Sequence, residues 1–457
     1  DPLWASPRIL SWHAWTVKLW ENAALAGIEG TDRAVLGQRQ CLSLWSGVLK
    51  DDPKAALLMR PESLARSIRD TRATLIEWHV PMNHPAWKGD ANENHAAFQR
   101  WNRAFEMQCE SEAWIPQEDR LEVLLASSRS ASHLNPGALR LLGFDEFTPQ
   151  QKAWLSALQA EGCETTELRL ETAQSEPPRF TLWQSNSEQD QLERMARWVR
   201  ERHEENPASR IAIVVADLQH RRPERERWLT STLCPAGHAD AMSKPWNVSL
   251  GFSLLEWPMI RAALDILQLV NSSPANPRVD LQAVGRLLRS PWNHGAREER
   301  QARALLEKCL RERYQRQLKL SEVRYRSREF NKYDAVGNEL PPDEQTAKPW
   351  NAPQFAAIVN ALMDFEVQKR SEQSPSAWAD AFETLLDRTG WPRAGMTGET
   401  SSQDWQAYQA WQDALRELAS LDATLPTISR SGAVRQLRQI CSDHVFQAAT
   451  APSNIQV

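Results

Sequence analysis

The stretch ALRLLGFDEFTPQQKAWLSALQAEGCETTELRL, residues 138–170, decides the fold class of this chain. It opens with an apolar run, residues 138–144, which follows an Asn-Pro-Gly turn and is typical of a buried strand. A helix is predicted next, because Thr148 can cap it, Pro149 suits its first position and Gln151 completes a capping box. The last six residues are predicted to form another strand. This order predicts two parallel strands that are joined by a crossover helix.

A second unit of the same kind follows the linker QSEPPR. Residues 179–183 are predicted to form a strand, and residues 187–206 an amphipathic helix with one apolar side. Residues 211–215 are almost wholly apolar, as strands are when they are buried on both faces of a parallel sheet. Another helix is expected at residues 222–233. The sequence therefore predicts a second parallel sheet.

Helices are predicted over most of the remaining chain. Residues 8–130 form successive amphipathic segments, and Thr31 is the expected N-cap of the second helix. After a Ser-, Pro- and Asn-rich boundary at residue 271, helices are predicted again to about residue 447. The closing residues 454–457 are predicted to form a strand that returns to the second sheet. One domain interrupted by a helical insertion fits this order better than three separate domains.

The expected fold is therefore a helix-rich α/β protein with three parts. Residues 1–176 form a partial first core with a helical insertion. Residues 177–275 form a second core, which residues 448–457 rejoin, and residues 276–447 form a helical insertion domain. A length of 457 residues agrees with about three domains.

The composition is that of an ordinary soluble globular protein, with 41% apolar and 25% charged residues. No apolar run approaches the roughly 18 residues that span a bilayer, and the first residues lack the pattern of a signal peptide. The six cysteines are widely scattered, which favours reduced thiols over disulfides or a zinc site. We therefore expect a cytoplasmic protein that has no metal and no membrane partner. Because the chain lacks an initiator Met and stops within a predicted strand, we also expect it to be a piece of a longer protein.

Tryptophan is unusually frequent, with 21 Trp against 4 Tyr. Many of these residues lie at helical spacing, such as Trp405, Tyr408 and Trp411. Periodic placement predicts that the rings pack between helices, where they bury a large area. Stacking on bases or sugars is the alternative interpretation.

Three segments in order resemble superfamily I DNA helicases of the UvrD and RecB type. They are PRILSWHAWTVKLW at 7–20, LRLLGFDEFTPQQ at 139–151 and RIAIVVADLQHRR at 210–222. The chain looks most similar to the degenerate AddB-like branch of bacterial helicase–nuclease repair proteins, and the resemblance covers nearly its whole length. The resemblance implies two RecA-like, P-loop-type motor cores, each with a helical insertion, and a nuclease domain after residue 457.

The resemblance also implies a DNA contact near the start of the chain. Ser11, Trp12 and His13 take the places of a Thr-Phe-His motif, which in the family ends a short strand beside single-stranded DNA. The nucleotide site, in contrast, looks inactivated. Hydrolysis needs a Gly-rich loop that ends in Gly-Lys-Ser/Thr, and no GxxxxGK[ST] occurs in this sequence. Ala216 stands where the family carries an Arg that touches the γ-phosphate, and a methyl group cannot stabilise transferred-phosphate charge.

The pair Asp145-Glu146 admits two alignments with the family. Aligned on Asp-Glu-Phe, the pair supplies a magnesium ligand and a catalytic carboxylate. Aligned on Asp-Gly-Phe followed by Phe-Thr-Pro, Leu142 takes the Asp place and the pair becomes a polar loop. The second alignment matches more neighbouring residues, so it is preferred. The sequence therefore indicates no cofactor, and ATP with magnesium enters only if a phosphate-binding loop precedes residue 1.

Residues 297–332 carry 12 Lys and Arg against 6 Asp and Glu, in a chain whose net charge is −5. A nucleic-acid-binding surface must therefore be local, and this segment is the candidate. Its tyrosines, interleaved with basic groups, suit a phosphate backbone with stacked bases. The alternative is a solvated helix face stabilised by Glu–Arg pairs. The cations selected as DNA contacts are Arg311, Arg313, Arg316 and Lys319.

Three functions remain open from the sequence. The preferred one is a DNA-binding scaffold, the helicase-like region of a DNA repair and recombination helicase–nuclease that has lost its motor and binds single-stranded or tailed DNA. The second is a fragment of an active ATP-dependent helicase. The third is a protein-interaction scaffold for a partner helicase or nuclease subunit.

Overall fold

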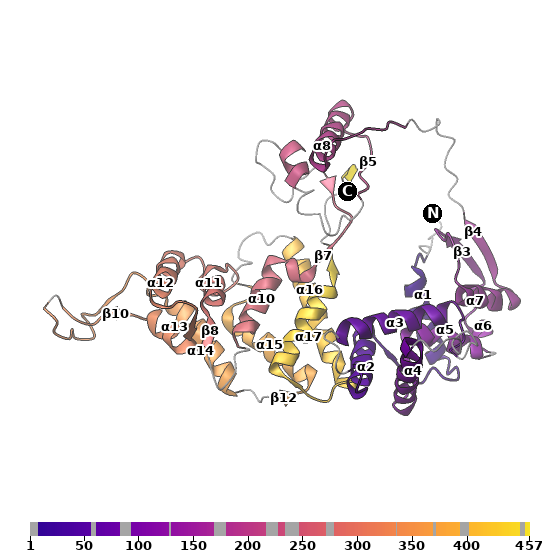
Figure 1. Ribbon diagram of the computed structural model, residues 1–457, viewed down its shortest axis with the longest axis horizontal. Coiled ribbons are helices and arrows are strands. Elements are labelled where there is room, and N and C mark those ends of the chain that lie inside the picture. The colour runs from indigo at the N-terminus through magenta and orange to yellow at the C-terminus, as the bar shows by residue number, and fades with distance from the viewer. Residues whose placement is uncertain are drawn as a thin grey trace, which may run out of the picture. The chain divides into compact units, whose positions relative to one another are not determined.

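The computed structural model describes most of the chain and divides it into two compact units, Asp1–Pro178 and Arg179–Val457 (Figure 1). The fold is a helix-rich α/β arrangement with small sheets. None of the helices that the structure describes is both long and apolar enough to cross a membrane. The described residues are 8–55, 61–82, 93–127, 129–168, 180–215, 227–233, 246–270, 278–334, 336–368, 372–393, 402–447 and 453–457.

The strand–helix–strand element that the sequence predicts is present in the first unit. Strand β3 (Ala138–Leu142) pairs in parallel with β4 (Glu164–Leu168), and α7 (Pro149–Ala160) connects them. The Thr148 hydroxyl accepts a hydrogen bond from the backbone amide of Gln151 at 3.3 Å, and the Gln151 side chain accepts one from the amide of Thr148 at 3.0 Å. The predicted capping box is therefore confirmed.

Helices make up most of the rest of the first unit. They are α1 (Trp12–Leu25), α2 (Gln38–Asp51), α3 (Pro61–Glu77), α4 (Glu93–Ser111), α5 (Arg120–Ala126) and α6 (Ser130–His133). Between α1 and α2 the sequence-based prediction is wrong, because β1 (Ala34–Leu36) pairs in parallel with β2 (Trp114–Pro116). The second helix consequently begins at Gln38, with Gly37 as its N-cap. The hydroxyl of Thr31, the predicted cap, instead donates to the carbonyl oxygen of Ile28 at 2.6 Å.

The second unit contains a small parallel sheet of three strands. Its order is β5 (Ile211–Ala212), β15 (Ile455–Gln456) and β6 (Trp246–Asn247), so the closing strand lies in the middle. This pairing confirms the predicted return of residues 454–457. Helix α8 (Glu188–Glu205), which was also predicted, packs Val199 with the buried side chains of the sheet.

The predicted strand at 179–183 is wrong for the residues described. Residues 180–185 belong to no helix or strand and pair with no strand of the described chain, and the side chains of Phe180 and Leu182 are 91% and 99% exposed. The Trp183 ring contacts the Trp198 ring of α8 at a centroid distance of 6.3 Å. An apolar run becomes a strand only where another strand offers its edge, and none of the described strands does so for residues 180–185.

A large helical array interrupts this sheet. Its helices are α10 (Pro258–Leu269), α11 (Leu281–Arg289), α12 (Arg300–Arg313), α13 (Leu320–Arg326), α14 (Pro353–Gln368), α15 (Pro375–Thr389), α16 (Ser402–Ser420) and α17 (Arg430–Asp443). They share one apolar core, in which Trp378 and Trp411 are fully buried. Burial was predicted for Trp411 from its spacing with Trp405 and Tyr408, but Trp405 of the same set is 52% exposed.

Short antiparallel strand pairs connect segments of the helical array. Two of them are β10 (Phe330–Asn331) with β11 (Thr346–Ala347), and β12 (Glu372–Gln373) with β13 (Ile428–Ser429). A third, β8 (Arg278–Asp280) with β9 (Gln317–Lys319), joins the start of α11 to the start of α13. The chain runs into the array through β7 (Phe252–Ser253) and leaves it through β14 (Val445–Phe446), and these two strands pair with each other.

Candidate nucleic-acid interface

Ser11, Trp12 and His13 lie at the beginning of α1 rather than at the end of a strand. The Ser11 hydroxyl caps the helix by accepting a hydrogen bond from the amide of Ala14 at 3.2 Å. Ser11 and His13 are exposed, whereas Trp12 is half-buried. Ser11 therefore has a structural role that the resemblance did not indicate.

An aromatic cluster brings these residues next to the loop that follows β3. The Trp12 ring lies edge-on to Trp15 and to Phe144, with centroid distances of 5.1 and 6.1 Å. Phe144 in turn stacks on Phe147 at 4.7 Å. Two segments that the sequence singled out for separate reasons thus share one surface of the first unit.

The loop after β3 presents its carboxylates to solvent. Asp145 and Glu146 are exposed and form no hydrogen bond or ion pair with any described residue, and Leu142, the last residue of β3, is 52% exposed. This arrangement suits the polar-loop interpretation of the pair. Ala216, the other position of the degenerate nucleotide site, lies outside the described residues.

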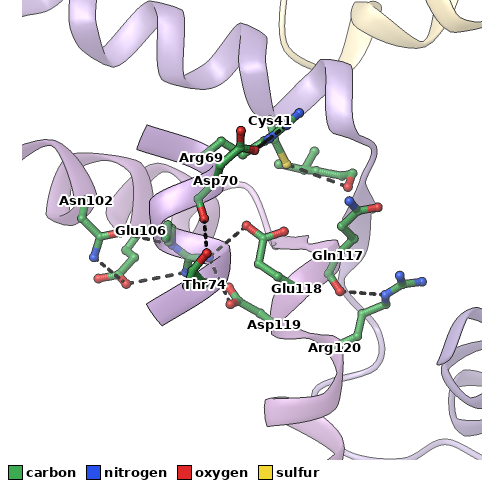
Figure 2. A network of polar contacts seen from close by, with 12 residues as sticks. Cys41, Arg69, Asp70, Thr74, Asn102, Glu106, Gln117, Glu118, Asp119 and Arg120 are labelled. Atoms are coloured by element: carbon green, nitrogen blue, oxygen red, sulfur yellow. Dashed lines mark hydrogen bonds and ion pairs between the residues drawn. The ribbon is translucent and has the colours of Figure 1, made fainter. Parts of the chain in front are cut away.

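A buried ion network in the first unit was not predicted at all (Figure 2). Arg72 of α3 is 4% exposed and donates to Asn102, to Glu118 and to both carboxylate oxygens of Asp119, over 2.8–3.3 Å. Glu106 lies 3.7 Å from the same guanidinium. One cation thus faces three carboxylates, and its donors are used in joining α3 to α4 and to the turn at 117–119.

The charged groups of this network shift one another's pKa values. Burial lowers the pKa of the Arg72 guanidinium, but Asp119, Glu118 and Glu106 raise that pKa by more, so Arg72 stays charged. Burial, helped by the charge of Asp119, raises the pKa of Glu118 above its usual range, although Arg72 opposes this shift. The cluster therefore joins α3, α4 and the turn at 117–119, and four hydrogen bonds commit the Arg72 guanidinium to groups within the unit.

The four predicted cations of the basic segment are all exposed in the second unit. Arg311 and Arg313 end α12, Arg316 follows it, and Lys319 ends β9. Arg311 is paired with Glu307 at 2.6 Å, which is the helix-stabilising alternative that the sequence left open. The side chains of Arg313, Arg316 and Lys319 form no ion pair within the described part of the chain.

The tyrosines of the segment do not gather beside these cations. Tyr314 is half-buried and packs against the helical core. Tyr325 is 55% exposed, but the guanidinium of Arg326 lies over its ring, 5.6 Å from the centroid. Tyr333, which is 62% exposed, follows β10. The interleaving of aromatic and basic residues in the sequence therefore does not produce one mixed surface.

A basic groove of about 860 Å³ lies between the end of α11 and one face of α12. Of the predicted residues it contains only Arg311. A signal for it exists in the sequence, because Arg297, Arg300, Lys308 and Arg311 lie at spacings that place them on one side of a helix. The groove is lined by six cations and two carboxylates, Arg289, Arg297, Arg300, Arg303, Lys308, Arg311, Glu307 and Glu312, with Leu288, Ser290, Pro291, Ala296 and Ala304 between them.

Buried ion pairs hold the groove in shape. Arg303, 2% exposed, is paired with Glu299 at 3.2 Å, and it also donates to Asn293 and to the carbonyl oxygen of His294. Glu299 in turn accepts hydrogen bonds from the first amides of α14, those of Gln354 at 2.6 Å and Phe355 at 3.0 Å. Burial lowers the pKa of Arg303 even though Glu299 opposes this effect.

A second carboxylate orients the cations at the mouth of the groove. Glu307 of α12 pairs both with Arg289, from the end of α11, and with Arg311. Because one carboxylate binds two guanidiniums, the two keep a net positive charge and a fixed direction.

Comparison with known proteins assigns no family to this chain. No protein-family model matches it, and no curated protein matches it in sequence.

Proposed function

We propose that this chain is the inactivated, helicase-like region of a bacterial DNA repair and recombination helicase–nuclease, and that it binds DNA without hydrolysing ATP. The two α/β pieces are the remnants of two RecA-like motor cores. The helical array is the insertion of the second core. The DNA contacts in this proposal are the basic groove, which includes Arg311, and the exposed cations Arg313, Arg316 and Lys319.

The observation that carries the proposal is the concentration of positive charge in the groove. Six cations and two carboxylates line it, in a chain whose overall charge is −5. Lys and Arg side chains that neutralise phosphates release counterions, and this release drives much of the binding to DNA. A local surface of this kind is what the chain's overall charge requires of a nucleic-acid binder.

The topology of the second unit supports the helicase-like part of the proposal. Its parallel sheet takes strands from residues 211–212, 246–247 and 455–456, and the helical array lies between the last two. The exposed Asp145 and Glu146, which hold no described partner, support the loss of hydrolysis.

A second function, a scaffold for a partner helicase or nuclease subunit, is favoured by one observation. Phe180 and Leu182 are almost fully exposed and lie two residues apart, and exposed apolar side chains grouped together mark interaction sites.

Fluorescence anisotropy with a labelled, tailed duplex at two salt concentrations tests DNA binding. We expect binding at about 50 mM salt and a loss of about 10³-fold or more at about 200 mM, the behaviour of a protein that contacts several phosphates. Absence of binding at low salt would leave the partner scaffold as the function to pursue.

ATP turnover by the same preparation, measured with and without DNA, tests the loss of the motor. We expect none. A DNA-stimulated rate in the usual enzyme range of about 1–1000 per second would instead identify an active helicase fragment.

A further inference from the structure

We infer that the basic groove between α11 and α12 binds the phosphate chain of a nucleic acid by charge and does not stack its bases. This inference rests on the proposed function, which makes nucleic acid the ligand, and it names the part of that ligand which the groove recognises.

The charge of the groove is only partly neutralised by the protein itself. Arg303 is committed to Glu299, and Glu307 is shared between Arg289 and Arg311. Arg300 is exposed and forms no side-chain ion pair with any residue that the structure describes. Lys308 lies 4.0 Å from Glu312, and both of these side chains are more than 60% exposed, so solvent screens their attraction. Arg300 and Lys308 therefore have charge to offer to a phosphate.

The lining of the groove contains no ring on which a base could stack. Its side chains are aliphatic, charged or, at Ser290, a hydroxyl, and the lining includes no aromatic ring and no Asn or Gln. Bases are usually held by stacking on aromatic rings, and adenine is read by the amides of Asn and Gln. The phosphate chain is the part of a nucleic acid that this lining fits.

The size of the groove supports a chain rather than a single anion. Its volume of about 860 Å³ lies near the upper end of the range for small-molecule sites, about 300–1000 Å³. Arg313, Arg316 and Lys319 follow Arg311 in sequence and are all exposed.

The test compares a charge variant of the groove with a matched control. Arg300→Gln with Lys308→Gln removes two exposed helix cations from the groove. Arg435→Gln with Arg438→Gln removes two exposed cations from α17, which packs chiefly on α16 and on the turn Leu254–Glu256 and does not line the groove. Each protein is titrated against labelled oligothymidine, an abasic strand of equal length and a blunt duplex, at several salt concentrations. Circular dichroism confirms that all proteins are folded.

We expect the groove variant to lower the slope of log affinity against log salt by about 2 in magnitude, and the control variant to leave that slope unchanged. The decisive number is the fold-loss of affinity that the groove variant causes on each ligand. Recognition by charge alone predicts the same fold-loss, within about twofold, on the abasic strand and on oligothymidine. A single stacked base would add about 5- to 100-fold to the affinity for the base-bearing strand.

Two results would overturn the inference while leaving the proposed function intact. One is a fold-loss confined to the base-bearing strand, which would show that the groove holds bases. The other is DNA binding that the groove variant weakens no more than the control does. If none of the three ligands binds the wild-type protein at low salt, the proposed function itself fails. The duplex and single-strand titrations show which form of nucleic acid supplies the phosphate chain.

Discussion

Arg72 shows how a single buried charge can set the stability of the first unit. Its guanidinium is surrounded by Glu106, Glu118 and Asp119, and it lies over the Phe105 ring, 5.4 Å from the centroid. A buried pair adds little stability over a well-packed apolar alternative, but removing one partner leaves a charge uncompensated. The network is therefore sensitive to the loss of Arg72, the cation that Glu106, Glu118 and Asp119 share.

We expect Arg72→Met to lower the free energy of unfolding of the first unit by about 3–5 kcal/mol, because the half-buried carboxylates of Glu118 and Asp119 lose the buried cation that they share. Urea unfolding measures this loss. The matched control is Lys54→Met, since Lys54 pairs with Glu93 while both side chains are more than 70% exposed. The control should change stability by less than about 0.5 kcal/mol, and equal losses in the two variants would contradict the role given to Arg72.

Glu118 gives the first unit a predictable pH dependence. Its folded-state pKa is raised by burial and by Asp119 above the unfolded value of about 4.3. The protonated side chain therefore favours folding. That contribution is fully present below the unfolded pKa and is lost as the pH rises through the folded pKa.

We expect Glu118→Gln, which stays neutral and can still accept from Arg72, to gain stability relative to the wild type between about pH 4 and about pH 7. Urea unfolding of both proteins at the two pH values measures the difference. A relative loss of stability over that interval would mean that the Arg72 charge outweighs burial at this carboxyl.

At the level of single elements, α7 depends on its capping box. Replacing Thr148 by Ala removes the acceptor for the amide of Gln151, and such losses cost about 0.5–2 kcal/mol. We expect thermal unfolding of the first unit to shift down accordingly. Asp145→Ala in the same loop is the control, because Asp145 contacts no described polar group, and its melting temperature should stay close to that of the wild type.

Substitution of Trp12 distinguishes two roles for this side chain at the start of α1, which are binding DNA and packing against neighbouring rings. Its edge-to-face contacts with Trp15 and Phe144 predict that Trp12→Ala lowers the melting temperature, with a loss on the order of 2 kcal/mol. DNA affinity of the folded variant, measured by anisotropy, should be unchanged if packing is the whole role. A loss of about 1–3 kcal/mol in binding would instead indicate a stacked base.

The elements that the sequence predicted well are those with local signals. The unit β3–α7–β4 carries its turn, cap and apolar runs within about thirty residues, so each part could be found from neighbours alone. Strand β1 could not be predicted from its neighbours in sequence, because it forms only by pairing with β2, which lies far along the chain. The strand prediction at residues 180–183 was wrong for the opposite reason. Their apolar pattern is that of a strand, but no described strand pairs with them.

The candidate site was predictable only in part. Composition located the basic segment, and one of the four cations selected from it, Arg311, lines the groove. The groove itself also needs Arg289, which another helix supplies, and no single-segment pattern could indicate that. Nor could the sequence show that Arg303, although basic, is buried and paired.

At the scale of the whole molecule, the second unit is a sheet with a helical array inserted into it. Strands β7 and β14 pair where the chain passes into and out of the array, and β15 then takes the central place in the sheet. The array has its own apolar core, which includes Leu254 and Phe446 near its two ends. It should therefore remain folded without the sheet.

Deletion of residues 453–457 should unfold the sheet and spare the array. Ile455 is fully buried, and β5 and β6 would have no described strand left to pair with. We expect hydrogen exchange to become fast over 188–215 and to stay slow over 258–269 and 402–420. Gln456→Ala, at an exposed position of the same strand, is the control and should change neither region. Fast exchange throughout the array would contradict its independence.

The central position of β15 also sets an order of events during synthesis. The ribosome makes β5 more than 200 residues before β15, and at about 5–20 residues per second the interval lasts roughly 10–50 s. During that time Ile211 and Ile213 have no central strand to cover them, although both are buried in the finished protein. The array can fold in the interval, whereas the sheet cannot. Nascent chains should therefore be most prone to aggregation, and most in need of a chaperone, after the array has folded and before the last strand emerges.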